Sequence, residues 1–150
     1  MKTIIFICHG SICRSPAAEF IAKDYLRKHN LLDQYNVFSR AVSLEEIGND
    51  VYPPMKRILL SHNVPMDRHY AQRITREEFD KADYIFVMDE NNLYYLNRLF
   101  PDARKEKVVN MPKFLNMDFS EIEDPWYTGR YELVYQEILM CIGKLFDCIK

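Results

Sequence analysis

One short segment near the start of the chain constrains its fold more than any other. The apolar run 4–7 ends at Cys8, a glycine-containing turn follows, and Arg14 then precedes a Ser-Pro pair that is typical of a helix start. When a strand turns tightly into a helix, backbone N–H groups and the positive end of the helix dipole converge on one point, where anions bind. The segment therefore predicts a phosphate-binding loop that begins at Cys8 and ends at Arg14.

The residue types in this loop suit a thiolate nucleophile. Converging N–H donors stabilise the negative charge of a cysteine thiolate, and a planar guanidinium matches two phosphate oxygens at once. A lone cysteine at a strand end is usually a small buried hydrophobe, but the combination of spacer, glycine, arginine and Ser-Pro disfavours that alternative. The residues expected to contact phosphate are His9, Gly10, Ser11, Ile12, Cys13, Arg14 and Ser15.

The segment resembles the Val-Cys-x-Gly-Asn-x-Cys-Arg-Ser-Pro signature of the low-molecular-weight protein tyrosine phosphatases. The chain has 150 residues, the size of that whole domain, and the similarity extends to the stretch 83–92 and to the loop around Asp124. The resemblance implies a single phosphatase domain over 1–150. It also implies cofactor-free hydrolysis of phosphotyrosine esters through a phosphocysteine intermediate on Cys8.

Three positions depart from the family pattern. His9 and Ser11 stand where Leu and Asn are usual, and Glu45 stands where many members place an aromatic residue at the pocket mouth. Ser11 is expected to brace the loop less well than Asn, and Glu45 puts selectivity for acidic phosphopeptides in doubt. His62 and His69 have no assigned chemistry, and a solvated or hydrogen-bonded surface role is expected for both.

Composition narrows the partners. The chain has 20 Lys and Arg against 22 Asp and Glu, a net charge of −2 with neutral His, so the charge balance favours neither a nucleic acid nor a membrane surface as partner. Its first apolar run is too short for a signal peptide, and the four cysteines form neither a disulfide framework nor a zinc pattern. We expect a cytoplasmic protein without metal or cofactor, acting on a phosphotyrosine-containing protein, with a cognate tyrosine kinase as a further partner.

Strand and helix patterns alternate along the chain. Ser15 is expected to cap a first helix, Thr75 begins a capping box, and Asp89 is expected to cap a helix that ends before 100. The other expected elements are strands at 35–40, 83–88 and 107–110, a helix from 53 to before 64, and a final helix after 129 with Tyr131, Val134, Tyr135, Ile138, Cys141, Ile142, Leu145 and Cys148 on one face. The pattern predicts an α/β fold: a single-domain four-stranded parallel sheet flanked by helices on both faces, with the phosphate-binding loop after strand 1.

The stretch 111–128 is long for a connection and rich in polar and aromatic residues, which is typical of a functional loop. Cleaving a phosphate ester requires an acid that protonates the leaving oxygen. Asp124, which precedes Pro125, is the candidate, although Asp-Pro turns are common at surfaces. The resemblance favours the catalytic role, because the family carries its general acid in an Asp-Pro pair at this place.

The substrate pocket is expected to include Glu45, Trp126 and Tyr127. The two aromatic side chains would form apolar walls deep enough for phosphotyrosine and too deep for phosphoserine, although Trp126 could instead be a core residue. Ile12 also bears on the substrate, because the phosphoarginine branch of the family has Thr at this position.

Ser15 and Cys13 are given supporting roles. The Ser15 hydroxyl can donate to the Cys8 sulfur as well as cap the helix. Cys13 can resolve a sulfenic acid on Cys8 as a disulfide, a role that the resemblance supports; its alternative role is packing.

Other functions compete with this interpretation. A thiol-dependent arsenate reductase on the same fold would need resolving cysteines, yet Cys141 and Cys148 would stand about 10 Å apart along a helix, beyond disulfide reach. A phosphocysteine carrier or an inactive phosphotyrosine-binding module would not need Cys8, Arg14 and Asp124 together.

Overall fold

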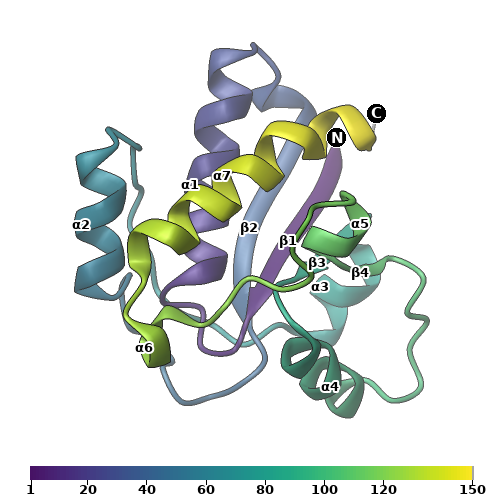
Figure 1. Ribbon diagram of the computed structural model, residues 1–150. Helices are drawn as coiled ribbons and strands as arrows, with labels where there is room; N and C mark the ends of the chain where they lie inside the picture. Colours follow the sequence, from purple (N-terminus) through teal and green to yellow (C-terminus); the bar gives the residue numbers. More distant parts are fainter. Residues whose placement is uncertain (150) are drawn as a thin grey trace.

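Four strands form one parallel sheet in the order β2-β1-β3-β4 in the computed structural model, which describes residues 1–149 (Figure 1). The strands are β1 (Lys2–Cys8), β2 (Tyr35–Ala41), β3 (Tyr84–Val87) and β4 (Val108–Asn110). The helices are α1 (Arg14–Lys28), the 3-10 turn η1 (Leu32–Gln34), α2 (Pro53–Ser61), α3 (Arg76–Lys81), α4 (Glu90–Leu99), α5 (Met111–Phe114), α6 (Pro125–Thr128) and α7 (Tyr131–Cys148). The predicted α/β fold is confirmed.

Helices cover both faces of the sheet because β1 is apolar on both sides. Ile4 and Phe6 point into a core with α1, α2, α5 and α7, whereas Ile5 and Ile7 point into a second core with α3 and α4. In Figure 1, α7 lies across α1 on the first face. Burial on both sides explains why β1 is a continuous apolar run rather than an alternating one.

Most element boundaries agree with the sequence patterns. The capping box at Thr75 forms as predicted, and Asp89 caps α4 by accepting a hydrogen bond from the N–H of Asn92 (2.8 Å). Cys148 is exposed rather than buried on the α7 stripe, because Ile149 fills the adjacent core position.

Two expectations about α1 and the stretch 111–128 are wrong. The first helix begins at Arg14, and Ser15 makes no capping bond because its hydroxyl is turned toward Cys8. The stretch 111–128 is not a continuous loop, since it contains the short helices α5 and α6.

The topology places the predicted loop at one edge of the sheet. Cys8 is the last residue of β1, and the loop that follows lies at the carboxyl end of the strands, beside α6 in Figure 1. Among the helices of residues 1–149, none is both long and apolar enough to span a membrane. The edge at the carboxyl ends of parallel strands is where α/β sheets bind ligands.

Candidate active site

The loop from Cys8 to Arg14 is fixed by backbone hydrogen bonds to neighbouring segments. The N–H of Tyr52 donates to the carbonyl of Ile12 (2.8 Å), and the N–H of Ser43 donates to the carbonyl of His9 (3.1 Å). Ser11 has a φ of 57°, in the left-handed region that Ser rarely adopts. The loop therefore holds a sharply turned backbone in place, as a cradle of N–H groups requires.

A chain of hydroxyl groups leads from the cysteine into the loop. The Cys8 thiol donates to Oγ of Ser15 (3.2 Å), and that hydroxyl donates to Oγ of Ser11 (3.0 Å). The N–H of Ser15 also donates to Sγ of Cys8 (3.4 Å). The N–H of Ser15 thus donates to the sulfur, and once the thiol is ionised the Ser15 hydroxyl can turn to donate to the thiolate as well.

His69 is part of this loop's support, and the expectation of a surface role for it is wrong. Its side chain is buried, and Nε2 lies 2.6 Å from the carbonyl oxygen of Ser11. The contact gives the strained Ser11 peptide a buried hydrogen-bond partner. His62 fits the surface expectation, since it is partly exposed and pairs with Glu132 at 2.9 Å.

Gly10 allows a close approach to Glu46. A Cβ atom at Gly10 would lie 3.0 Å from Cγ of Glu46, closer than ordinary van der Waals contact. The Glu46 side chain also lines the pocket in front of Cys8. A larger residue at position 10 would require the Glu46 side chain to shift.

Arg14 is buried and held from two sides. Its Nη1 donates to Oδ2 of Asp89 (2.6 Å) and to the carbonyl of Ile122 (2.8 Å), and Nη2 lies 3.6 Å from Oδ2 of Asp124. Burial lowers the pKa of Arg14, but Cys8, Asp89 and Asp124 outweigh it, so the net pKa is raised above its ordinary value. The guanidinium is a fixed cation at the edge of the loop.

Asp124 reaches the pocket from the start of α6, far along the chain from Cys8. Its Oδ1 caps α6 by accepting a hydrogen bond from the N–H of Trp126 (3.0 Å), and its Oδ2 faces Arg14. The segment turns into α7 at Gly129, whose φ of 73° favours glycine. The cap aims one carboxyl oxygen at the pocket while leaving it partly exposed.

One pocket joins these groups. Its lining includes Cys8, His9, Gly10, Ile12, Cys13, Arg14, Glu45, Glu46, Asp124, Trp126 and Tyr127. Trp126 is half exposed rather than a core residue, and its ring lies 4.8 Å from that of Tyr52. Tyr127 is more exposed still. The structure thus brings together every residue predicted for the site except Ser11 and Ser15, which lie buried behind it.

The two cysteines of the loop differ from the other two. Burial raises the pKa of the Cys13 thiol far above its usual range, and the nearby Cys8 and Asp124 raise it further. Cys141 is buried and Cys148 is exposed on α7, and neither lines the pocket.

No group of three His, Cys, Asp or Glu side chains within residues 1–149 has an arrangement that could hold a metal ion.

Sequence reasoning missed three residues of this site: Asp89, His69 and Glu46. Asp89 was expected only as a helix cap, yet its second oxygen holds Arg14. The arrangement presents a buried sulfur, converging donors, a fixed cation and a carboxyl group around one pocket. These are the groups needed to transfer a phosphoryl group to sulfur and to protonate a leaving oxygen.

Comparisons with known proteins agree with this chemistry. The family model described as low molecular weight phosphotyrosine protein phosphatase matches residues 3–150. A rat protein with the same description is 36% identical over 150 residues, covering 97% of this chain and 94% of the relative. The crystal structure of YfkJ from Bacillus subtilis superposes with a TM-score of 0.95 at 29% identity, covering 99% of this chain and 94% of the other. The low molecular weight protein tyrosine phosphatase from Streptococcus pyogenes gives 0.90 at 29% identity, covering 100% and 94%.

Proposed function

The chain belongs to the low molecular weight phosphotyrosine protein phosphatase family, and on that premise we propose that Cys8, Arg14 and Asp124 carry out its reaction. The activity of the family is hydrolysis of phosphotyrosine in proteins. What remains to be assigned is the role of each residue in this chain. One observation supports the assignment above all: the Cys8 sulfur, the Arg14 guanidinium and the Asp124 carboxyl meet at one pocket although Asp124 lies far from the others in sequence.

In the first step, the Cys8 thiolate attacks phosphorus, and the bond from phosphorus to the tyrosyl oxygen breaks. Asp124 gives its proton to that oxygen, so tyrosine leaves as a neutral phenol. The backbone N–H groups of the loop and Arg14 bind the three equatorial oxygens, whose charge is greatest in the transition state. The N–H of Ser15, which donates to the sulfur, stabilises the thiolate before it attacks.

In the second step, the Asp124 carboxylate takes a proton from a water molecule as the water attacks the phosphocysteine. The bond from sulfur to phosphorus breaks, the Cys8 thiolate is restored, and inorganic phosphate leaves. One carboxyl group therefore serves as acid and then as base. Asp124 lines the pocket and is partly exposed, so the leaving oxygen and a water molecule can both reach its carboxyl group.

Replacing Cys8 tests the covalent mechanism. We expect Cys8→Ser to abolish hydrolysis of aryl phosphates while inorganic phosphate still binds, because the loop donors and Arg14 remain. Cys148→Ser, at an exposed position on α7, is the matched control and should keep full activity. Turnover that persists in Cys8→Ser would exclude a phosphocysteine on this residue. The same variant, used to retain phosphoproteins from a lysate, would identify substrates.

The proposed substrate is phosphotyrosine rather than a shorter phosphoamino acid. Trp126 and Tyr127 stand at the mouth of the pocket and Cys8 is buried behind it, so the phosphate must be carried inward by a long side chain. Ile12 supports phosphotyrosine over phosphoarginine, since the phosphoarginine branch has Thr there. Peptides that differ only in phosphotyrosine, phosphoserine or phosphoarginine test this, and faster cleavage of either alternative would contradict it.

Cys13 is proposed to protect Cys8 from irreversible oxidation. Peroxide converts the Cys8 thiolate to a sulfenic acid; the Cys13 thiol then displaces water, and a Cys8–Cys13 disulfide forms. Both cysteines line the same pocket, and the raised pKa of Cys13 keeps it from being the first target of peroxide. Peroxide followed by a thiol reductant should restore the wild type and Cys148→Ser but not Cys13→Ser. Equal recovery in all three would remove this role.

These roles fit a reducing compartment, and we place the enzyme in the cytoplasm. Its substrates are phosphoproteins, and a cognate tyrosine kinase would supply them. Neither a nucleic acid nor a membrane is proposed as a partner. Fractionation of cells that express the tagged protein tests the location.

A further inference from the structure

Two departures from the family pattern meet in space. Nε2 of His9 lies 3.1 Å from Oε2 of Glu45, so the residue after the nucleophile holds a carboxylate at the pocket mouth. The edge of the Tyr95 ring packs against His9, with centroids 5.4 Å apart. A hydrophobic residue and an aromatic residue, the usual pair at these positions, would leave this place apolar. This chain puts a fixed charge there.

The His9–Glu45 pair stands between the catalytic pocket and a second groove. Both residues line both hollows, as do Arg14, Asp124 and Tyr127. The His9–Glu45 pair thus forms a ridge, and the groove continues from it to the start of α4 and to the segment before α6. A polypeptide whose phosphotyrosine reaches Cys8 must leave the pocket past this ridge, so residues next to the phosphotyrosine can enter the groove.

The groove wall offers charges of one sign. Glu45 is largely exposed, and Glu121, which also lines the groove, is fixed by accepting a hydrogen bond from the N–H of Glu90 (2.7 Å). Glu46 adds a third carboxylate at the pocket itself. Among the described residues that line the two hollows, Arg14 is the one arginine and there is no lysine.

Other charges near the groove are already paired. Asp89 binds Arg14, and Glu123 receives two hydrogen bonds of 2.8 Å from Arg130. Lys113, which approaches Glu121, is bound to Glu90 at 2.7 Å and does not line the groove. Within the groove, Glu45 and Glu121 are therefore the carboxylates that a substrate cation can approach, and Glu46 lies at the pocket itself.

We propose that Glu45 and Glu121 form a subsite for a lysine or arginine beside the phosphotyrosine, an inference that rests on the proposed function. A basic neighbour gains two carboxylate partners, whereas an acidic neighbour meets like charges. Each exposed pair contributes up to about fivefold. The enzyme is thereby specific for phosphotyrosine in a basic sequence context.

The test compares three phosphotyrosine peptides of equal length, with lysine, glutamine or glutamate on both sides of the phosphotyrosine. At low ionic strength and one pH, kcat/KM for the lysine peptide should exceed that for the glutamate peptide about tenfold, from gains at two exposed pairs. The ratio should shrink as salt is added, because the screening length falls to about 8 Å at 0.15 M.

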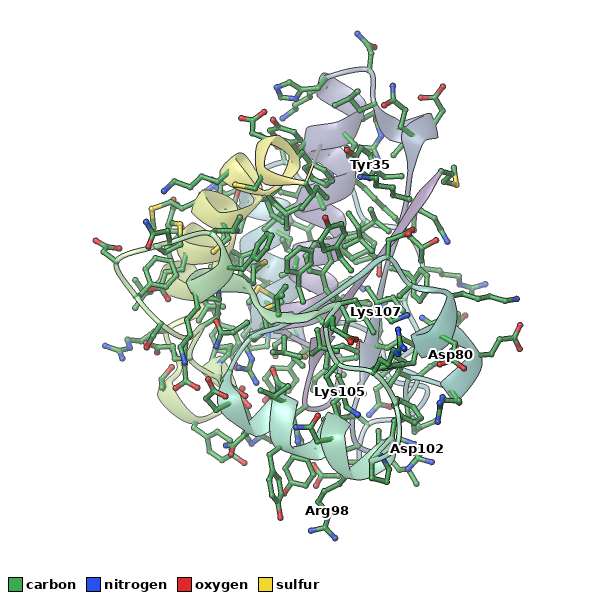
Figure 2. The ribbon with its side chains drawn as sticks, turned by 90° about the vertical axis from the view of Figure 1, so that its right-hand side faces the viewer. Tyr35, Asp80, Arg98, Asp102, Lys105 and Lys107 are labelled. Carbon is green, nitrogen blue, oxygen red and sulfur yellow. The ribbon has the colours of Figure 1, made fainter. Side chains whose placement is uncertain are left out.

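Charge-neutral variants locate the effect. Glu45→Gln should lower the lysine-to-glutamate ratio to about threefold, and adding Glu121→Gln should bring it within about twofold, since each change removes one exposed pair. Glu106→Gln is the control of equal charge, because Glu106 is exposed before β4 at the opposite end of the sheet. Figure 2 labels its neighbours Lys105 and Lys107. Glu106→Gln should leave both the ratio and the basal activity unchanged.

The outcomes separate this inference from the proposed function. If all three peptides are cleaved equally, or the glutamate peptide is preferred, the subsite is refuted although Cys8-dependent hydrolysis stands. If the ratio is tenfold but survives Glu45→Gln with Glu121→Gln, the assignment of these residues is refuted. If no phosphotyrosine peptide is cleaved, the proposed function itself fails.

Discussion

The two segments that form the proposed active site are built differently. The loop 8–15 is largely buried and is held both by bonds within it, such as that from Ser15 to Ser11, and by bonds to distant residues such as His69. The segment 118–128 is more exposed, and it is anchored at the buried Ile122, whose N–H donates to the carbonyl of Met88 (2.9 Å) and whose carbonyl accepts from Arg14 (2.8 Å). The loop 8–15 is therefore a buried part of the fold, whereas the segment 118–128 lies over it at the surface.

This difference matches the two kinds of work in the proposed reaction. Binding phosphate and stabilising a thiolate need donors fixed before the substrate arrives. Delivering a proton needs a carboxyl group that substrate and water can both reach. Arg14 lies at the junction, since it belongs to the loop yet binds the carbonyl of Ile122. Mutations can separate the two contributions.

The largest expected effect is on the exposed segment. Asp124→Ala should slow hydrolysis of esters with poor phenolic leaving groups by about 10²–10⁴-fold, the range for general acid catalysis. An activated nitrophenyl ester should be slowed much less, because its leaving oxygen needs little protonation. Steady-state kcat with a series of aryl phosphates measures the difference.

Asp118→Ala, in the same segment but outside the pocket, is the control and should behave like the wild type. Equal losses for activated and unactivated esters would show that Asp124 is not the acid, and Glu123 would be the next residue to test.

Arg14→Lys should have the next largest effect. An ammonium cannot form the two parallel bonds of the guanidinium, so we expect kcat to fall about 10²–10³-fold, as when one preorganised donor is removed. Arg40→Lys is the matched control, because Arg40 is also partly buried and paired with a carboxylate, Glu78, at 2.7 Å. Arg14→Lys activity within a few fold of the wild type would make Arg14 a structural residue.

His69→Ala tests whether the loop depends on support from behind. The substitution leaves the buried carbonyl of Ser11 without its partner and should lower the free energy of unfolding by about 1–3 kcal/mol. His29→Ala, at an exposed position after α1, should cost less than about 1 kcal/mol. Urea unfolding measures both.

Phosphate binding sharpens the His69 prediction. If the histidine positions the loop, His69→Ala should bind inorganic phosphate more weakly, and His69→Gln, which keeps a donor, should recover part of the loss. Destabilisation with unchanged phosphate affinity would limit His69 to a packing role.

The same contrast explains what the sequence could predict. Cys8 and Arg14 are recognisable because their spacing encodes the loop locally, as Thr75 and Asp89 encode their helix caps. Asp124 could be proposed from its Asp-Pro pair only with the help of a family resemblance. The helix α6 that it caps was missed, because four residues are too few to show a helical period.

Support for the loop comes from residues that no local pattern marks. His69 meets Ser11 across 58 positions and Asp89 meets Arg14 across 75. Nothing in the sequence next to His69 indicates that the fold buries its side chain. Of the two roles expected for Ser15, the contact with the Cys8 sulfur is present, and the helix cap, which a local pattern suggested, is not.

The smallest expected effect concerns the aromatic residues of the exposed segment. Trp126 packs on Tyr52 whereas Tyr127 is 84% exposed, so only Trp126 has a fixed ring to offer the substrate. Trp126→Ala should raise KM for phosphotyrosine peptides about two- to tenfold, the value of one aromatic pair, and Tyr127→Ala about twofold. Neither should change kcat much, because Asp124 stays in place. Tyr94→Ala, exposed on α4 outside both hollows, is the control. A larger effect from Tyr127 than from Trp126 would mean that the segment closes over the substrate, so that its exposed end becomes part of the rigid site.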